Sequence, residues 1–111
     1  MKVNILGTEY SVVIADEETK PKLKNSDGYM DNSTKEIVVG KFVPDENSLE
    51  DLKEYTKKVL RHEIIHAFFY ESGMWNCSGC SEAWGQDETI TDWLAIQSPK
   101  IFKAFQECDC L

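Results

Sequence analysis

The sequence predicts an α+β domain in which a small, mostly antiparallel β-sheet of three to four strands precedes the helices. Before residue 41, apolar and polar residues alternate in stretches separated by glycine- and asparagine-rich turns, as in strands with one buried face. Residues 48–72 contain neither proline nor glycine, and their apolar residues recur every three to four positions, as on one helix face. With 111 residues, of which 41% are apolar, we expect one domain spanning residues 1–111.

Two pairs of strands are expected in the first part of the chain. Alternation on both sides of Gly7 predicts a β-hairpin between Lys2 and Ala15. Residues 16–27 are charged and lack either periodicity, so we expect a surface loop with room for a short helical turn. Residues 28–40 contain a turn-rich middle followed by a β-branched run, which predicts two short strands joined by a tight turn.

The helices are expected in the second part of the chain. Asn47 or Ser48 can cap a long helix that ends before Gly73. A second helix is expected from residue 81 or 82 to residue 97. A proline at position 99 disfavours simple continuation, so we expect a separate short helix over residues 99–107. The apolar residues that this last helix is expected to pack are Ile101, Phe102 and Phe105.

The net charge and the N-terminal sequence limit the binding partners and the cellular compartment that we expect. The formal net charge is -8, so nucleic acid and anionic membranes are not expected as main partners, because both would be repelled. Polar residues interrupt every apolar run near the N-terminus, and no stretch is long enough to cross a bilayer. We therefore expect a cytoplasmic protein whose four cysteines are reduced thiols or metal ligands.

The motif with the most specific chemistry is His62-Glu63-x-x-His66, which contains both histidines of the chain. On a helix, residues four apart project from one face, so the two imidazoles can share a zinc ion while Glu63 lies beside it as a candidate general base. The alternative is a helix whose two histidines face the core without a metal.

A zinc ion held by two histidines needs a third protein ligand, which must here be a carboxylate or a thiolate. Glu71 lies on the wrong face of the expected helix. Glu88 and Asp92 are four residues apart, so Glu88 can bind zinc while Asp92 accepts a hydrogen bond from a zinc-bound histidine. Glu82 is the alternative ligand, and ordinary solvated carboxylates are the alternative interpretation of the pair.

This combination resembles the gluzincin arrangement of thermolysin-like peptidases, and the resemblance covers residues 62–92. The size and element order are similar to those of minigluzincins and of small metallopeptidases encoded by phages and mobile elements. The resemblance implies a zincin-like fold and an extended peptide substrate that pairs with residues 37–40 as a sheet edge. Two features depart from the family: Asp87 replaces the usual asparagine before the glutamate, and no further histidine can stabilise an oxyanion.

The sequence also suggests how such a site would work. Glu63 would take a proton from the attacking water and pass it to the leaving amine. The oxyanion donor would be Tyr70, which follows His66 by four residues, or else Tyr55, Tyr29 or a backbone amide. The resulting prediction is a zinc metallopeptidase. A weakly active or non-catalytic zinc-binding module of a phage or regulatory complex is the alternative, and hydrolysis of a non-peptide amide is a third reading.

The cysteines suggest a second metal site. Cys77-x-x-Cys80 has the spacing of a zinc knuckle, whereas the spacing of Cys108-x-Cys110 is too short for one. Together these four thiolates could hold a structural zinc ion that fastens the C-terminal tail to the loop between the helices. A disulfide or redox pair and unpaired thiols are the alternatives.

Overall fold

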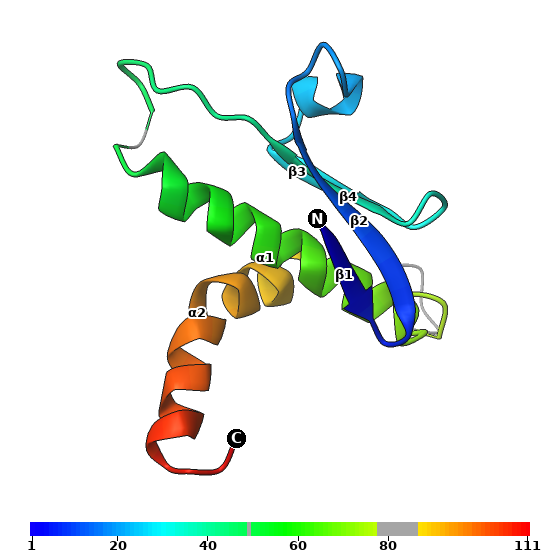
Figure 1. Ribbon diagram of the computed structural model, residues 1–111, viewed down its shortest axis with the longest axis vertical. Helices are drawn as coiled ribbons and strands as arrows, with labels where there is room; N and C mark the ends of the chain where they lie inside the picture. Colours follow the sequence, from blue (N-terminus) through cyan, green and yellow to red (C-terminus); the bar gives the residue numbers. More distant parts are fainter. Residues whose placement is uncertain (49, 78–86) are drawn as a thin grey trace.

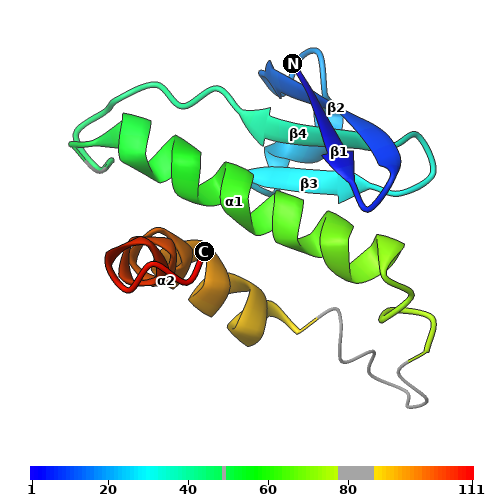
Figure 2. The ribbon, with the colours of Figure 1, turned by 60° about the horizontal axis from the view of Figure 1, so that its bottom comes forward.

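The computed structural model describes residues 1–48, 50–77 and 87–111, and it confirms the α+β class. A four-stranded sheet is followed by two long helices, and α1 lies between the sheet and α2 (Figures 1 and 2). The elements are β1 (Lys2–Ile5), β2 (Thr8–Ala15), a 3-10 helix (Pro21–Lys24), β3 (Gly28–Asp31), β4 (Glu36–Gly40), α1 (Leu52–Glu71) and α2 (Glu88–Glu107).

The sheet consists of the two predicted hairpins joined side by side. Its strand order is β1-β2-β4-β3, with antiparallel pairs at both ends and a parallel pair, β2 with β4, in the middle. Ile37, Val38 and Val39 of β4 are at most 1% exposed, because this strand has neighbours on both sides. The expectation that residues 37–40 form a sheet edge is therefore wrong, and the strand at that edge is β3.

One face of the sheet packs on α1 and forms the core. The central cluster of buried residues comes from three strands and the helix, and partly buried Leu60 and Ile64 of α1 pack against it. Three-to-four spacing along α1 thus marks the face that covers the sheet, as the periodicity predicted. The buried members of the cluster are Ile5, Tyr10, Val12, Ile37 and Ala67.

The N-cap of helix α1 lies three to four residues after the predicted caps. The Ser48 hydroxyl accepts a hydrogen bond from the amide of Asp45 and donates one to its carbonyl, both at 3.0 Å. Asp51 caps the helix instead, because its carboxylate accepts the amide proton of Glu54 at 3.0 Å. The helix ends at Glu71, and Gly73 follows with a φ of 84°, a left-handed conformation that favours glycine.

Helix α2 runs without interruption from Glu88 through Pro99 to Glu107, so the predicted separate helix over residues 99–107 does not exist. Asp87 caps its start, and the predicted start at residue 81 or 82 lies outside the described residues. The helix bends partway, and its second half projects from the body (Figure 1). Phe102 and Phe105 are consequently 54% and 41% exposed, and the expectation that they pack in the core is wrong.

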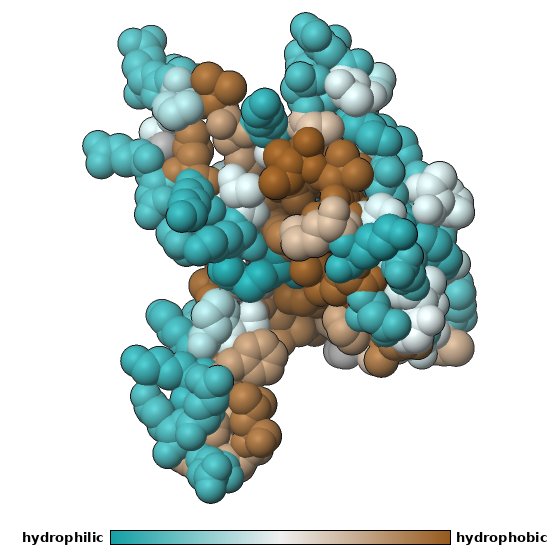
Figure 3. Space-filling model, in the orientation of Figure 1, coloured by the Kyte–Doolittle hydropathy of each residue, from teal (hydrophilic) through white to brown (hydrophobic). Residues whose placement is uncertain are grey.

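Hydrophobic side chains accordingly appear on the surface of the projecting half of α2 (Figure 3). Neither helix in the described part of the chain combines the length and the apolar character that crossing a bilayer requires. The first turns of α2, unlike its projecting half, are buried. Thr91 and Ala95 are at most 1% exposed and lie on the side of the helix that packs on α1.

Candidate metal centre

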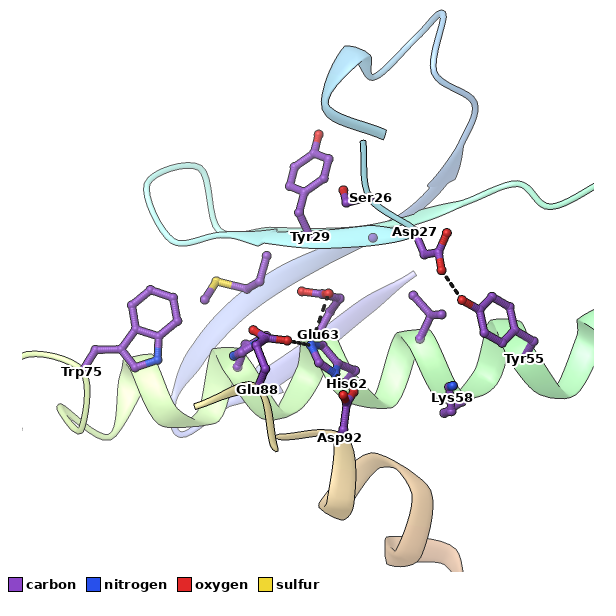
Figure 4. A pocket seen from close by; sticks show the side chains of 14 residues that line it. Ser26, Asp27, Tyr29, Tyr55, Lys58, His62, Glu63, Trp75, Glu88 and Asp92 are labelled. Atoms are coloured by element: carbon purple, nitrogen blue, oxygen red, sulfur yellow. Dashed lines mark hydrogen bonds and ion pairs between the residues drawn. The ribbon is translucent and has the colours of Figure 1, made fainter. Parts of the chain in front are cut away.

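The histidines of α1 and the first residue of α2 form a compact group of potential metal ligands (Figure 4). The Nε2 atom of His62 lies 3.0 Å from one carboxylate oxygen of Glu88, and the Nε2 atom of His66 lies 2.9 Å from the other. One ligand atom from each of the three residues lies within 4.8 Å of the others. This group could hold a metal ion.

Two imidazoles and a carboxylate are ligands that bind zinc and other divalent metal ions. Zinc–nitrogen and zinc–oxygen bonds of about 2.0–2.1 Å place tetrahedral ligand atoms roughly 3.3 Å apart. The two contacts of Glu88, at 2.9 and 3.0 Å, are close to that spacing. Burial lowers the pKa of His66, which favours the neutral imidazole that metal binding requires. Among the described residues the buried Nδ1 of His66 has no hydrogen-bond partner, whereas its Nε2 faces the carboxylate of Glu88.

Asp92 holds the other nitrogen of His62. The Nδ1 atom of His62 lies 2.8 Å from Oδ1 of Asp92, one helical turn after Glu88 on the same face of α2. A carboxylate in this place orients the ring and selects the tautomer whose Nε2 lone pair is available to a metal. The predicted contact between a histidine and this aspartate is therefore present.

Glu63 lies beside the group and is almost completely buried. The residue is 6% exposed, and Oε1 lies 4.0 Å from Nε2 of His62. Burial and the nearby Glu88 carboxylate raise the pKa of Glu63 to about 7. A carboxyl group with this pKa can both accept and release a proton near neutral pH.

These side chains open into a cavity of about 490 Å³ between β3, α1 and the start of α2. Three of its lining residues, Asp27, Lys58 and Trp75, were not anticipated from the sequence. Asp27 accepts a hydrogen bond from the Tyr55 hydroxyl, a contact that joins the start of β3 to α1 at one end of the cavity (Figure 4). None of the three belongs to a recognisable motif. They are far apart in the sequence and come together only in the folded structure.

The three candidate tyrosines occupy different places. Tyr29 and Tyr55 line the cavity, although the ring of Tyr29 points away from the histidines and Glu63 (Figure 4). Tyr70 is not among the residues that line the cavity. Its ring lies 4.9 Å from the ammonium of Lys35 and 5.4 Å from the ring of Trp75.

The predicted thiolate cluster is not assembled in the described part of the chain. Cys77, Cys108 and Cys110 are exposed free thiols, and no group of three potential ligands contains any of them there. Cys80, the fourth predicted ligand, and Glu82, the alternative zinc ligand, lie outside the described residues.

Comparisons with known proteins assign this chain to no family. No protein-family model matches the sequence, and neither a curated protein nor a solved structure matches it. The functional interpretation therefore depends on the contacts described above.

Proposed function

We propose that the protein is a zinc-dependent metallopeptidase with His62, His66 and Glu88 as metal ligands and Glu63 as the general base. The observation that carries this proposal is the meeting of both histidines with Glu88 directly beside a buried carboxyl group. Glu88 is separated from His66 by 88 − 66 = 22 residues. An ordinary solvated carboxylate does not need to contact two imidazoles. The position of Glu88 therefore favours a metal ligand over a surface charge.

Each residue has a distinct role in this proposal. Zinc, when bound, supplies a Lewis acid that activates water near neutral pH and polarises the scissile carbonyl. Glu63 accepts the proton of the attacking water and delivers it to the leaving amine. Asp92 keeps His62 in the orientation that binds the metal.

The edge strand β3 is the element that would hold the substrate. β3 is at the end of the sheet next to α1, and its residues Gly28, Tyr29 and Met30 line the cavity. An extended peptide could pair with the free side of this strand and lay its scissile bond over the metal centre. The substrate class is thus an unfolded or flexible peptide segment.

Stabilisation of the oxyanion would come from donors in the cavity wall. Lys58 and Trp75 line the cavity and carry hydrogen-bond donors, whereas the Tyr55 hydroxyl donates to Asp27 and the ring of Tyr29 points away from the histidines. Lys58 precedes His62 by one helical turn and so shares its face of α1. Because Tyr70 does not line the cavity, its proposed catalytic role has the least support from these contacts.

The proposal is tested by metal content and by hydrolysis. Purified wild type should contain about one zinc ion per chain, Glu88→Ala should lose it, and a double variant Cys77→Ser/Cys80→Ser should keep it. The zinc-loaded wild type should cleave an unstructured peptide library, and a chelator should stop the cleavage. Zinc kept in Glu88→Ala but lost in the cysteine variant would overturn the proposed centre.

A non-catalytic zinc-binding module is the second candidate function. It is favoured by the histidine content, because both histidines of the chain belong to the metal group and none remains for an oxyanion. Zinc binding without hydrolysis of any peptide in the library would favour this candidate. Hydrolysis that disappears in Glu63→Gln would exclude it.

A further inference from the structure

The carbonyl of Ala95 in α2 accepts a hydrogen bond from another helix at the point where Pro99 interrupts the helical hydrogen bonding. Proline has no amide hydrogen, so the carbonyl of Ala95, four residues earlier, loses its usual helical donor. Ala95 is 1% exposed, and water therefore cannot readily replace that donor. The Nε atom of Arg61 on α1 donates to this carbonyl at 2.5 Å.

This contact continues a row of contacts between α1 and α2. Arg61 directly precedes His62, and Ala95 follows Asp92 by three residues and Glu88 by seven. Glu88, Asp92 and Ala95 therefore lie on one face of α2, and each meets the same short segment of α1. Within this row, the bond from Arg61 to Ala95 is the one that involves no group of the metal centre.

Besides these polar contacts, the first turns of α2 are held on α1 by the packing of Thr91 and Ala95. The side chains of Glu88 and Asp92 are 67% and 60% exposed, so burial does not position them. The second half of the helix turns away from α1 (Figures 1 and 2). Phe102, in this half, is more than half exposed. The main partner of α2 is α1, on which only the first turns are packed.

We propose that Arg61 is a positioning residue of the metal centre. Its bond to the carbonyl that Pro99 leaves without a helical donor sets the position of α2 along α1, and thereby brings Glu88 and Asp92 to the two histidines. This inference rests on the proposed metal function, and it adds a residue that no metal-binding motif contains. Pro99 contributes to the same contact, because it leaves the Ala95 carbonyl available as the acceptor for Arg61.

A double-mutant cycle on zinc affinity tests the proposal. Arg61→Met keeps most of the aliphatic stem but removes the donor, and it should weaken zinc binding roughly 10- to 100-fold, as expected for a lost hydrogen bond from a charged group. Pro99→Ala supplies a helical amide for Ala95, so Arg61→Met should cost less than about threefold in that background. Arg61→Lys retains a donor and should recover most of the affinity. Affinities are measured by competition with a chromophoric chelator.

The direction of the change separates positioning from simple electrostatics. Removing a positive charge near a cation site should by itself strengthen metal binding. Lys57→Met removes a charge from the same helix, where Lys57 pairs with Glu54 at 3.1 Å, and should leave zinc affinity unchanged or slightly higher. If zinc affinity falls in Arg61→Met but not in Lys57→Met, the fall is therefore due to the missing hydrogen bond and not to the missing charge.

A second readout separates positioning from fold stability. The melting temperature of the metal-free variants measures stability, and the visible absorption of the Co²⁺-substituted protein reports the geometry around the metal. In Arg61→Met the Co²⁺ spectrum should change and should return to that of wild type in Arg61→Lys. A lower melting temperature with unchanged zinc affinity and an unchanged Co²⁺ spectrum would show a structural role only and would overturn the inference.

The remaining outcomes distinguish this inference from the proposed function. In one outcome, wild type binds zinc, but Arg61→Met lowers the zinc affinity equally with and without Pro99→Ala. This outcome would overturn the proposed role of Arg61 and leave the metal centre standing. A wild type that binds no zinc would overturn the metal centre and the role of Arg61 with it. A loss in Arg61→Met that Pro99→Ala suppresses would support both.

Discussion

Nδ1 of His62 lies 2.8 Å from Oδ1 of Asp92, while Nε2 of the same ring lies 3.0 Å from Glu88. A single imidazole is thus held between two carboxylates from successive turns of α2. In the proposed metal centre, the nitrogen that faces Asp92 would carry the hydrogen and the lone pair of the other nitrogen would be available to the metal. The docking of α2 would then be coupled to metal binding.

Removal of Asp92 should weaken the metal centre without affecting the fold. Asp92→Ala should lower zinc affinity about 10- to 100-fold, as is typical when the hydrogen-bond partner of a ligating histidine is lost. The melting temperature of the metal-free protein should change little, because the Asp92 side chain is 60% exposed. Glu107→Ala, at the far end of α2, is the matched control and should bind zinc like wild type. Equal affinities in the two variants would contradict the proposed role of Asp92.

Glu63→Gln should separate chemistry from metal binding. The amide keeps the size of the buried side chain but cannot accept the water proton, so hydrolysis should fall roughly 100- to 10,000-fold. Elemental analysis should still find zinc in this variant, because Glu63 lies beside the ligand group and is not part of it. Hydrolysis at the wild-type rate would exclude Glu63 as the general base.

At Gly28, β3 lies close to α1. A Cβ atom at this position would lie 2.9 Å from the Val38 carbonyl oxygen and 2.9 Å from Val59, and 3.4 Å from Cγ of Glu63. Gly28→Ala should therefore destabilise the protein by about 1–3 kcal/mol, because β3 must move away from the helix. Denaturant unfolding measures this change, and hydrolysis should fall with it. Ser26→Ala, at an exposed neighbouring position, should change stability by less than about 0.5 kcal/mol.

The hydrogen bond between Tyr55 and Asp27 predicts a loss of stability at high pH. This bond, together with burial and the charge of Asp27, raises the pKa of Tyr55 to about 12 from its usual 10.0. The folded state therefore favours the neutral phenol. The resulting stability is fully present below pH 10 and is lost as the pH rises toward 12.

Tyr55→Phe tests this pH dependence. Wild type should lose stability relative to the variant between pH 10 and pH 12, as measured by urea unfolding at each pH. Ultraviolet titration should show that the variant lacks one phenol that ionises near pH 12 in wild type. A Tyr55 that ionises at its ordinary pKa would mean that the contact with Asp27 does not persist in solution.

Phe102 should matter little for stability, although the sequence predicted a core position. The ring is 54% exposed, and its described ring contact is Phe105, 6.4 Å away between centroids. Phe102→Ser should therefore cost less than about 1 kcal/mol, whereas Ile37→Ala in the core should cost about 2–5 kcal/mol. A loss above about 2 kcal/mol in Phe102→Ser would show that this surface is covered in solution.

Much of the local structure follows from the sequence by itself. Alternation around Gly7 predicts the first hairpin, and the proline- and glycine-free stretch predicts α1, because strand and helix periods are local properties of the chain. The metal group is predicted in the same way. His62 and His66 are one helical turn apart, as are Glu88 and Asp92, so each pair shares a face before any tertiary contact exists.

The tertiary structure decided how these local elements meet. The parallel pairing of β2 with β4 places β3 at the edge, and no alternation within a strand reveals which strand will be its neighbour. Asp27, Lys58 and Trp75 reach the cavity from three separate segments, which local periodicity cannot bring together. Arg61, 34 residues earlier in the sequence, donates a hydrogen bond to the Ala95 carbonyl that Pro99 leaves without a helical donor. Local propensity disfavours a helix that runs through such a proline, and this contact between two helices exists only in the tertiary structure.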